Sequence, residues 1–272
     1  MAEKWLPKGL IGVVHLPALP GDPCYDGRSM DEVVSFALAD ADAMVEGGIQ
    51  TMIVENFGSA PFPKGDAAHP MPPHHVAIMT LVAREIRRNH PDLTLGINCL
   101  RNDGYAALGI AMAVGAQFVR INVLTGAYVT DQGVIEGDAY GILRYRQQLG
   151  ASHVAILADV LVKHATPLAP LSAVDATKDT LLRGHADAVI VTGSGTGEPV
   201  DRKTLEEVSR AADGRPVLIG SGTKPETLPN YATFIKGAIV GTALKKDGLV
   251  SNPVDVERVQ KMVRVFNSLV KV

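Results

Sequence analysis

The feature that most constrains the fold is the alternation of eight short runs, rich in valine and isoleucine, with longer amphipathic stretches. Such alternation is typical of βα units, in which helices join the strands of a parallel sheet. The predicted strands cover residues 9–16, 50–56, 94–100, 118–123, 153–160, 188–193, 216–222 and 234–242. The predicted helices cover residues 31–46, 76–89, 104–114, 140–149, 177–183, 204–212, 226–231 and 254–270.

Eight such units in 272 residues predict one (β/α)8 TIM barrel over residues 1–272, since such barrels take about 250 residues. A doubly wound sheet uses the same alternation, but eight units in this length favour closure. No linker or shift in composition indicates a second domain. The Pro- and His-rich stretch 57–75 after the second strand is predicted to be an extended loop on the active face.

Composition and charge argue against several kinds of partner. A net charge of -3 does not attract nucleic acid or an anionic membrane by itself. No apolar run reaches the ~18 residues of a membrane span, and the first residues lack the apolar core of a secretory signal. Cys24 and Cys99 form no CxxC pair, which fits a reducing compartment. We therefore expect a cytoplasmic protein without nucleic-acid partners, and homo-oligomerisation stays open.

Polar residues or glycines end every predicted strand, and in a barrel the carboxyl ends of the strands open onto the active face. Burying so many polar groups is costly unless they bind one another or a ligand. We expect catalytic residues among His15, Glu55, Arg120, Asp159 and Lys163. We expect substrate-binding residues among Asn56, Asn98, Asn122, Thr192, Gly193, Gly195 and Thr196.

Structural roles compete with the catalytic ones. A histidine at a strand end is often a hydrogen-bonded packing residue, and strand-end asparagines often satisfy loop backbone. Arg120 could pair with Glu55 or Asp159 in the barrel mouth for purely structural reasons. The convergence of all these groups on one rim favours a functional site.

The two last strands carry the clearest chemical signal. Gly220, Ser221 and Gly222 end the seventh strand, and Gly241 and Thr242 end the eighth. Many TIM barrels hold a phosphate in these two loops. Glycines let backbone N–H groups approach an anion, and hydroxyl groups add donors. The alternative is that the glycines only make tight βα turns.

A metal site has less support from the sequence. His15, Glu55 and Asp159 could supply ligands from different strands, and His69, His74 and His75 lie in the loop after the second strand. No HxH or HExxH spacing is present, so we expect no required metal or other cofactor. Hard oxygen ligands would favour Mg²⁺ if an ion binds.

Several segments together resemble the BtpA family, which includes SgcQ-type proteins, over essentially the whole chain. They are residues 12–21 (GVVHLPALPG), 54–58 (VENFG), 96–98 (GIN), 118–127 (FVRINVLTGA), 158–165 (ADVLVKHA), 191–197 (VTGSGTG), 220–222 (GSG) and 236–245 (KGAIVGTALK). Many relatives carry a histidine where this chain has Leu161, so no catalytic weight rests there.

The resemblance implies a TIM barrel of the ribulose-phosphate-binding kind and does not fix a reaction. The family takes its name from a role in photosystem I accumulation at the cyanobacterial thylakoid surface. Members also occur in non-photosynthetic organisms, and nothing in this sequence indicates contact with a photosystem.

Three function classes follow from these observations. The first is an enzyme acting on a small phosphorylated metabolite, a sugar phosphate or a nucleotide. Glu55 and Asp159 would then be acid and base, and Lys163 or Arg120 would stabilise a developing anion. Glycosidic-bond cleavage or transfer, isomerisation and aldol (lyase) chemistry all fit. The other two classes are a non-catalytic assembly factor and a sensor of a phosphorylated ligand. The number of ionisable groups favours the enzyme.

Overall fold

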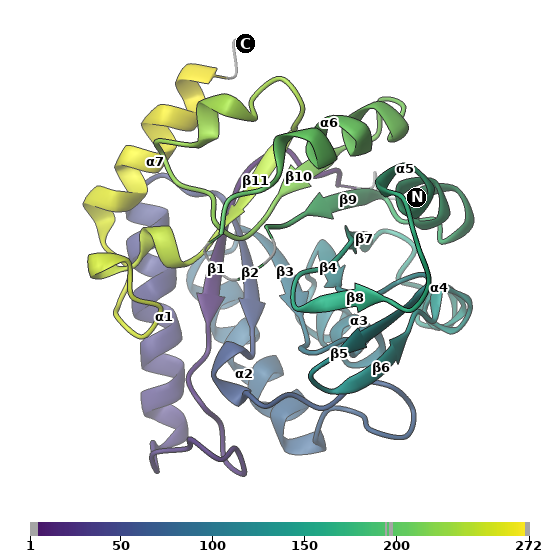
Figure 1. The fold of residues 1–272 in the computed structure, drawn as a ribbon. Coiled ribbons are helices and arrows are strands. Elements are labelled where there is room, and N and C mark those ends of the chain that lie inside the picture. The colour runs from purple at the N-terminus through teal and green to yellow at the C-terminus, as the bar shows by residue number, and fades with distance from the viewer. Residues whose placement is uncertain (1–4, 194, 196–197, 270–272) are drawn as a thin grey trace.

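Eight parallel strands close into a barrel, in which β11 pairs back with β1 (Figure 1). The computed structural model describes residues 5–193, 195 and 198–269. The barrel strands are β1 (Gly9–His15), β2 (Thr51–Glu55), β3 (Thr94–Asn98), β4 (Phe118–Ile121), β7 (Ala155–Val160), β9 (Ala188–Val191), β10 (Val217–Ile219) and β11 (Gly237–Val240). The predicted TIM barrel is confirmed. Most strands end earlier than predicted, because the polar residues that follow them turn into the loops of the rim.

Helices surround the barrel and follow its strands in turn (Figure 1). They are α1 (Met30–Glu46), α2 (Pro73–Asn89), α3 (Gly104–Val114), α4 (Ala139–Gln148), α5 (Ala173–Lys178), α6 (Arg202–Ala211) and α7 (Val256–Leu269). A π-helical turn, η2 (Asp179–Arg183), extends α5. Ser29 caps α1 through a reciprocal capping box with Glu32.

The helix predicted over residues 226–231 is wrong. The chain between β10 and β11 forms only a 3₁₀ turn, η3 (Leu228–Asn230). Pro229 lies inside this short segment and lacks the N–H that an α-helix needs at an interior position. The seventh unit of the barrel therefore has no α-helix, which leaves the segment after β10 as an open loop beside α7.

The barrel interior is an apolar plug below the rim. Ile11, Ile53, Leu157 and Leu218 are buried inside it together with Phe118. A Cβ on Gly96 would lie 2.2 Å from the Phe118 ring, so this position has room only for glycine. Trp5 stacks on Phe118 at 4.8 Å between ring centroids and closes the lower end. The interior is therefore filled, and a cavity opens at the carboxyl ends of the strands.

A small antiparallel sheet lies outside the barrel and was not predicted. It has the order β6-β5-β8, with β5 (Ala127–Thr130), β6 (Gly133–Glu136) and β8 (Ala165–Pro167). Its strands come from the loops after β4 and β7, so it ties these two rim loops together (Figure 1). Within the residues that the structure describes, no helix is long and apolar enough to cross a membrane.

Candidate functional site

Four polar side chains at the ends of neighbouring strands form a continuous row. The register pairs His15 with Glu55, Glu55 with Asn98, and Asn98 with Arg120. Register partners in adjacent parallel strands point to the same side of the sheet. The row therefore faces the barrel mouth as one group, which brings together three of the five predicted catalytic residues.

Glu55 is the centre of this row. Its Oε2 accepts a hydrogen bond of 2.6 Å from Asn98 and lies 3.9 Å from an Arg120 nitrogen. Its Oε1 lies 4.0 Å from His15 Nε2. The carboxylate is 7% exposed and lines the cavity described below. Glu55 is thus held by a hydrogen bond at Oε2, and its Oε1 faces the neutral His15 ring.

Asp159 pairs with Arg120 through two hydrogen bonds. Arg120 Nε donates to Oδ1 at 2.9 Å, and Nη2 donates to Oδ2 at 2.8 Å. Asn122 donates to the same Oδ2 at 3.2 Å. Burial lowers the pKa of Arg120 but the Asp159 charge and hydrogen bond outweigh it, so the net pKa is raised. Arg120 is therefore a fixed cation, and both Asp159 oxygens are occupied.

His15 is neutral at physiological pH. Burial lowers the pKa of its imidazole to about 4, against the opposing pull of Glu55. Its ring meets the edge of Phe57 at 4.8 Å, and its buried Nδ1 has no hydrogen-bond partner within the described residues. A Cβ on Gly241 would lie 2.3 Å from His15 Cε1. Glycine at position 241 thus lets the eighth strand pass directly beside this ring.

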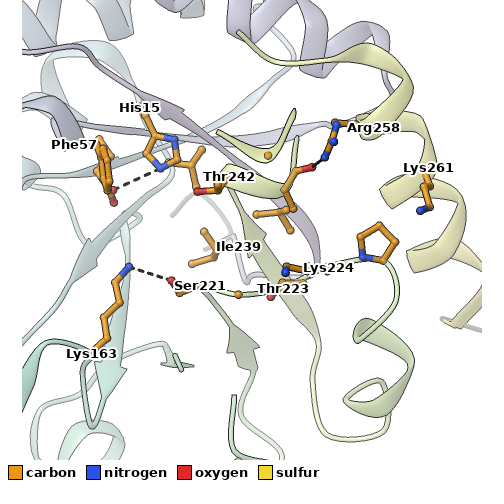
Figure 2. Close-up of a pocket in the computed structure, with 18 of the residues that line it drawn as sticks. His15, Phe57, Lys163, Ser221, Thr223, Lys224, Ile239, Thr242, Arg258 and Lys261 are labelled. Carbon is orange, nitrogen blue, oxygen red and sulfur yellow. Dashed lines mark hydrogen bonds and ion pairs between the residues drawn. The ribbon is translucent and has the colours of Figure 1, made fainter. Parts of the chain in front are cut away.

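Lys163 lies between the row and the turns after β10 and β11. Its Nζ donates to Ser221 Oγ at 3.1 Å, across the mouth from the loop after β7 to the loop after β10 (Figure 2). Burial lowers the pKa of Lys163, and the neighbouring Arg120 lowers it further. A lysine in this position can contact a ligand at either end of the site.

The predicted phosphate loops lie side by side. Ser221 and Gly222 have φ of 24° and 78°, left-handed values that form a sharp turn after β10. Thr242 begins the 3₁₀ turn η4 (Thr242–Leu244) directly after β11. Ser221, Gly222, Gly241 and Thr242 all line the same cavity. The two turns thus present backbone and hydroxyl groups to one space.

That space is a cavity of about 790 Å³ at the carboxyl end of the barrel. Of the predicted site residues, His15, Glu55, Arg120, Lys163, Ser221, Gly222, Gly241 and Thr242 line it. Sequence reasoning missed Phe57, Thr223, Lys224, Arg258 and Lys261, which line it too (Figure 2). Phe57 directly follows a predicted strand end and Lys224 follows another by two residues, so their positions in the sequence carried a usable signal. Arg258 and Lys261 share one face of α7, which is equally typical of cations that face solvent.

The other predicted ligand-binding residues are not among those that line the cavity. The Asn56 side chain bonds the Leu100 N–H and carbonyl, which is a structural role. Asn98 Oδ1, Asn122 Oδ1 and Thr192 Oγ1 are buried without hydrogen-bond partners among the described residues. A Cβ on Gly193 or Gly195 would meet Glu198, at 2.2 Å and 3.2 Å, and one on Gly220 would meet Thr192 at 3.2 Å. Thr196 lies outside the described residues.

The metal ligands considered from sequence do not converge. Asp159 is occupied by Arg120, and His15 stands 4.0 Å from Glu55. His74 and His75 both contact the carbonyl oxygen of Pro20, at 2.8 Å and 3.0 Å. No cluster of three or more His, Cys, Asp or Glu side chains suited to a metal ion occurs in the described part of the chain.

The lowered pKa of His15 predicts a loss of stability in acid. The unfolded chain, with an ordinary His pKa of 6.5, binds a proton that the native state binds only near pH 4. Stability contributed by His15 is therefore complete above pH 6.5 and falls as the pH drops toward about 4, by about 3 kcal/mol. Urea unfolding at several pH values should show a smaller loss for His15→Gln than for the wild type. Equal losses in both proteins would contradict the assignment.

Comparisons with known proteins agree with the fold and give the family. A solved thiamine phosphate pyrophosphorylase from Pyrococcus furiosus superposes with a TM-score of 0.57 over 97% of each chain, at 12% identity. An uncharacterized protein of Thermococcus kodakarensis is 45% identical over 263 residues, 96% of each chain. The photosystem I biogenesis protein BtpA of Synechocystis is 44% identical over 257 residues, 94% of this chain and 87% of that protein. The family model described as the BtpA family matches residues 6–268, which confirms the resemblance, and the chain belongs to that family.

Proposed function

We propose that this protein is an enzyme that acts on a small phosphorylated metabolite by acid–base chemistry at the barrel mouth. One observation carries the proposal: a single cavity joins the Glu55 carboxylate to the two turns after β10 and β11. Small-molecule sites in barrels occur at this face, and volumes of about 300–1,000 Å³ are usual for them. A ligand whose phosphate lies on the turns would reach Glu55 with its carbon skeleton.

The phosphate end is supported by its donors and its charge. Ser221 and Thr242 supply hydroxyl groups, and Lys163, whose Nζ donates to Ser221 Oγ at 3.1 Å, supplies positive charge beside them. The left-handed turn at Ser221 and Gly222 lets backbone approach an anion closely. The superposed pyrophosphorylase is named for a phosphate ester, thiamine phosphate, in agreement with this choice of ligand.

The structure distinguishes the two carboxylates that the sequence treated alike. Asp159 has both oxygens bound to Arg120 and does not line the cavity, so we assign it the role of positioning Arg120. Glu55 lines the cavity and keeps Oε1 available, so we assign it the proton transfer. We assign neutral His15, which lines the cavity 4.0 Å from Glu55 Oε1, a proton exchange with the same ligand. Arg120 and Lys163 would stabilise negative charge that develops on the ligand.

Two asparagines that do not themselves line the cavity, Asn98 of the row and Asn122 after β4, bind side chains of the site and support the choice of a hydroxylated ligand. Asn98 and Asn122 each donate to a site carboxylate and keep a carbonyl oxygen without a partner in the described residues. Buried acceptors of this kind are normally paired. We therefore retain both as candidate substrate-binding residues for sugar hydroxyl groups.

The name of the Synechocystis relative supports one competing function, assembly of a protein complex without catalysis. An assembly factor would tolerate changes in the barrel mouth and would not be stabilised by small phosphorylated compounds. A sensor would be stabilised by them without converting them.

A thermal-shift screen with product analysis separates these functions. Sugar phosphates and nucleotides are each paired with the same compound lacking phosphate. A phosphorylated ligand at 100 times its Kd should add about 2.7 kcal/mol of stability, and its unphosphorylated partner much less. Each hit is then incubated with protein and followed for product. Turnover supports the enzyme, stabilisation without turnover favours the sensor, and no response to any phosphorylated compound overturns the phosphate site.

A further inference from the structure

We infer that the cavity holds a second anion subsite, formed by Lys224, Arg258 and Lys261, and that the substrate therefore carries a second anionic group. The inference rests on the proposed function, because it places this group at the far end of the same ligand. The inner subsite is the phosphate turn around Ser221 and Thr242. The outer subsite lies beyond that turn, toward α7 (Figure 2).

Three cations from two separate elements border this outer part. Lys224 follows the turn at Gly222 by two residues, in the open loop that replaces the missing seventh helix. Arg258 and Lys261 lie one turn apart on α7, so their side chains share a helix face. All three line the cavity that also contains Ser221 and Thr242. Lys224 and Arg258 are 34 positions apart in the sequence. The fold therefore brings these cations together.

The charges here are only partly neutralised by the protein. Lys261 pairs with Glu226 at 2.6 Å. Arg258 Nη1 has a long contact of 3.5 Å to the Ala243 carbonyl oxygen. Within the described residues, no carboxylate oxygen lies within 4.0 Å of the side-chain nitrogens of Lys224 or Arg258. Asp247 also lines the cavity, so three cations face two carboxylates and the local balance is positive.

The size of the cavity agrees with a ligand that reaches both subsites. Its 790 Å³ lies in the upper part of the usual range of about 300–1,000 Å³ for small-molecule sites. A sugar with one phosphate on the inner turn and its reactive carbon at Glu55 would leave the side toward Arg258 unfilled. A second phosphate or a carboxylate on the sugar would pair with the cations there, and guanidinium groups bind both kinds of anion bidentately.

Calorimetric titration with ligand pairs on one carbon skeleton tests the inference. Fructose 6-phosphate and fructose 1,6-bisphosphate form one pair, and ribose 5-phosphate and ribulose 1,5-bisphosphate another. 6-Phosphogluconate distinguishes a carboxylate from a second phosphate. We expect the better doubly anionic ligand to bind the wild type at least tenfold more tightly than its monophosphate. Arg258→Gln should remove most of this gain and change the monophosphate affinity less than twofold.

Arg264→Gln is the matched control, because Arg264 is an exposed arginine on the same helix that does not line the cavity. Arg264→Gln should leave both affinities unchanged. If this variant also bound the doubly anionic ligand more weakly, the gain would come from the overall positive charge of the protein and not from a subsite, which would contradict the inference. Equal affinities of mono- and dianionic ligands in the wild type would overturn the second subsite and leave the proposed function standing. Absence of binding by every phosphorylated ligand would overturn both.

Discussion

Replacing Asp159 with alanine is expected to destabilise the protein by about 3–5 kcal/mol, the usual cost of leaving a buried charge without its partner. Arg120 is 7% exposed and donates two hydrogen bonds to this carboxylate. Glu55 cannot replace Asp159, because it lies 3.9 Å away and is held by Asn98. Urea unfolding followed by circular dichroism measures the loss.

Two further variants make this result specific to the ion pair. Asp92→Ala removes an exposed carboxylate and should change stability by less than about 0.5 kcal/mol. The double variant Arg120→Met/Asp159→Leu replaces the pair by apolar side chains and should recover most of the stability. A loss below about 1 kcal/mol in Asp159→Ala would show that Arg120 does not depend on Asp159.

Glu55→Gln is expected to lower kcat by about 10²–10⁴-fold on the substrate found by the screen, because a general base typically contributes that factor. Glutamine keeps the shape of the side chain and an oxygen that can accept from Asn98, so the fold and the phosphate affinity should be retained. Steady-state kinetics and calorimetry on the same protein measure both quantities.

Asp159→Asn is the informative comparison for this experiment. It leaves Glu55 unchanged and weakens the hold on Arg120, so its loss of activity should come with a loss of stability. Glu55→Gln should lose activity alone. Retention of turnover in Glu55→Gln would remove the proton-transfer role from Glu55.

Strand positions were readable from the sequence, since buried parallel strands are continuous apolar runs. The small outer sheet could not be predicted from the sequence. Its strand β8 has only three residues, and its pairing with β5 depends on two loops meeting in space. At residues 226–231 the sequence predicted an element that the structure lacks. The pattern there was typical of a helix, but Pro229 does not permit one.

The location of the site could be predicted, because the carboxyl ends of barrel strands form the active face. Which site side chains pair with one another could not be predicted. Strand ends placed His15, Glu55 and Arg120 on one rim, as the register now shows. Whether Arg120 pairs with Glu55 or Asp159 depends on side-chain geometry, and the structure gives Asp159. Arg258 was missed because a cation on an amphipathic helix looks the same whether it faces solvent or a cavity.

Phosphorus NMR tests the central claim, that the turns after β10 and β11 hold the phosphate of a ligand. The resonance of a sugar phosphate selected by the screen is recorded with wild type, Gly222→Asn and Gly222→Asp. Asparagine and aspartate have nearly the same shape, and both tolerate the left-handed conformation of residue 222, whose φ is 78°. We predict that the resonance shifts or broadens with the wild type, retains part of this effect with asparagine, and loses it with aspartate, whose charge repels the phosphate. An unchanged resonance with the wild type, or the same change with all three proteins, would contradict the account.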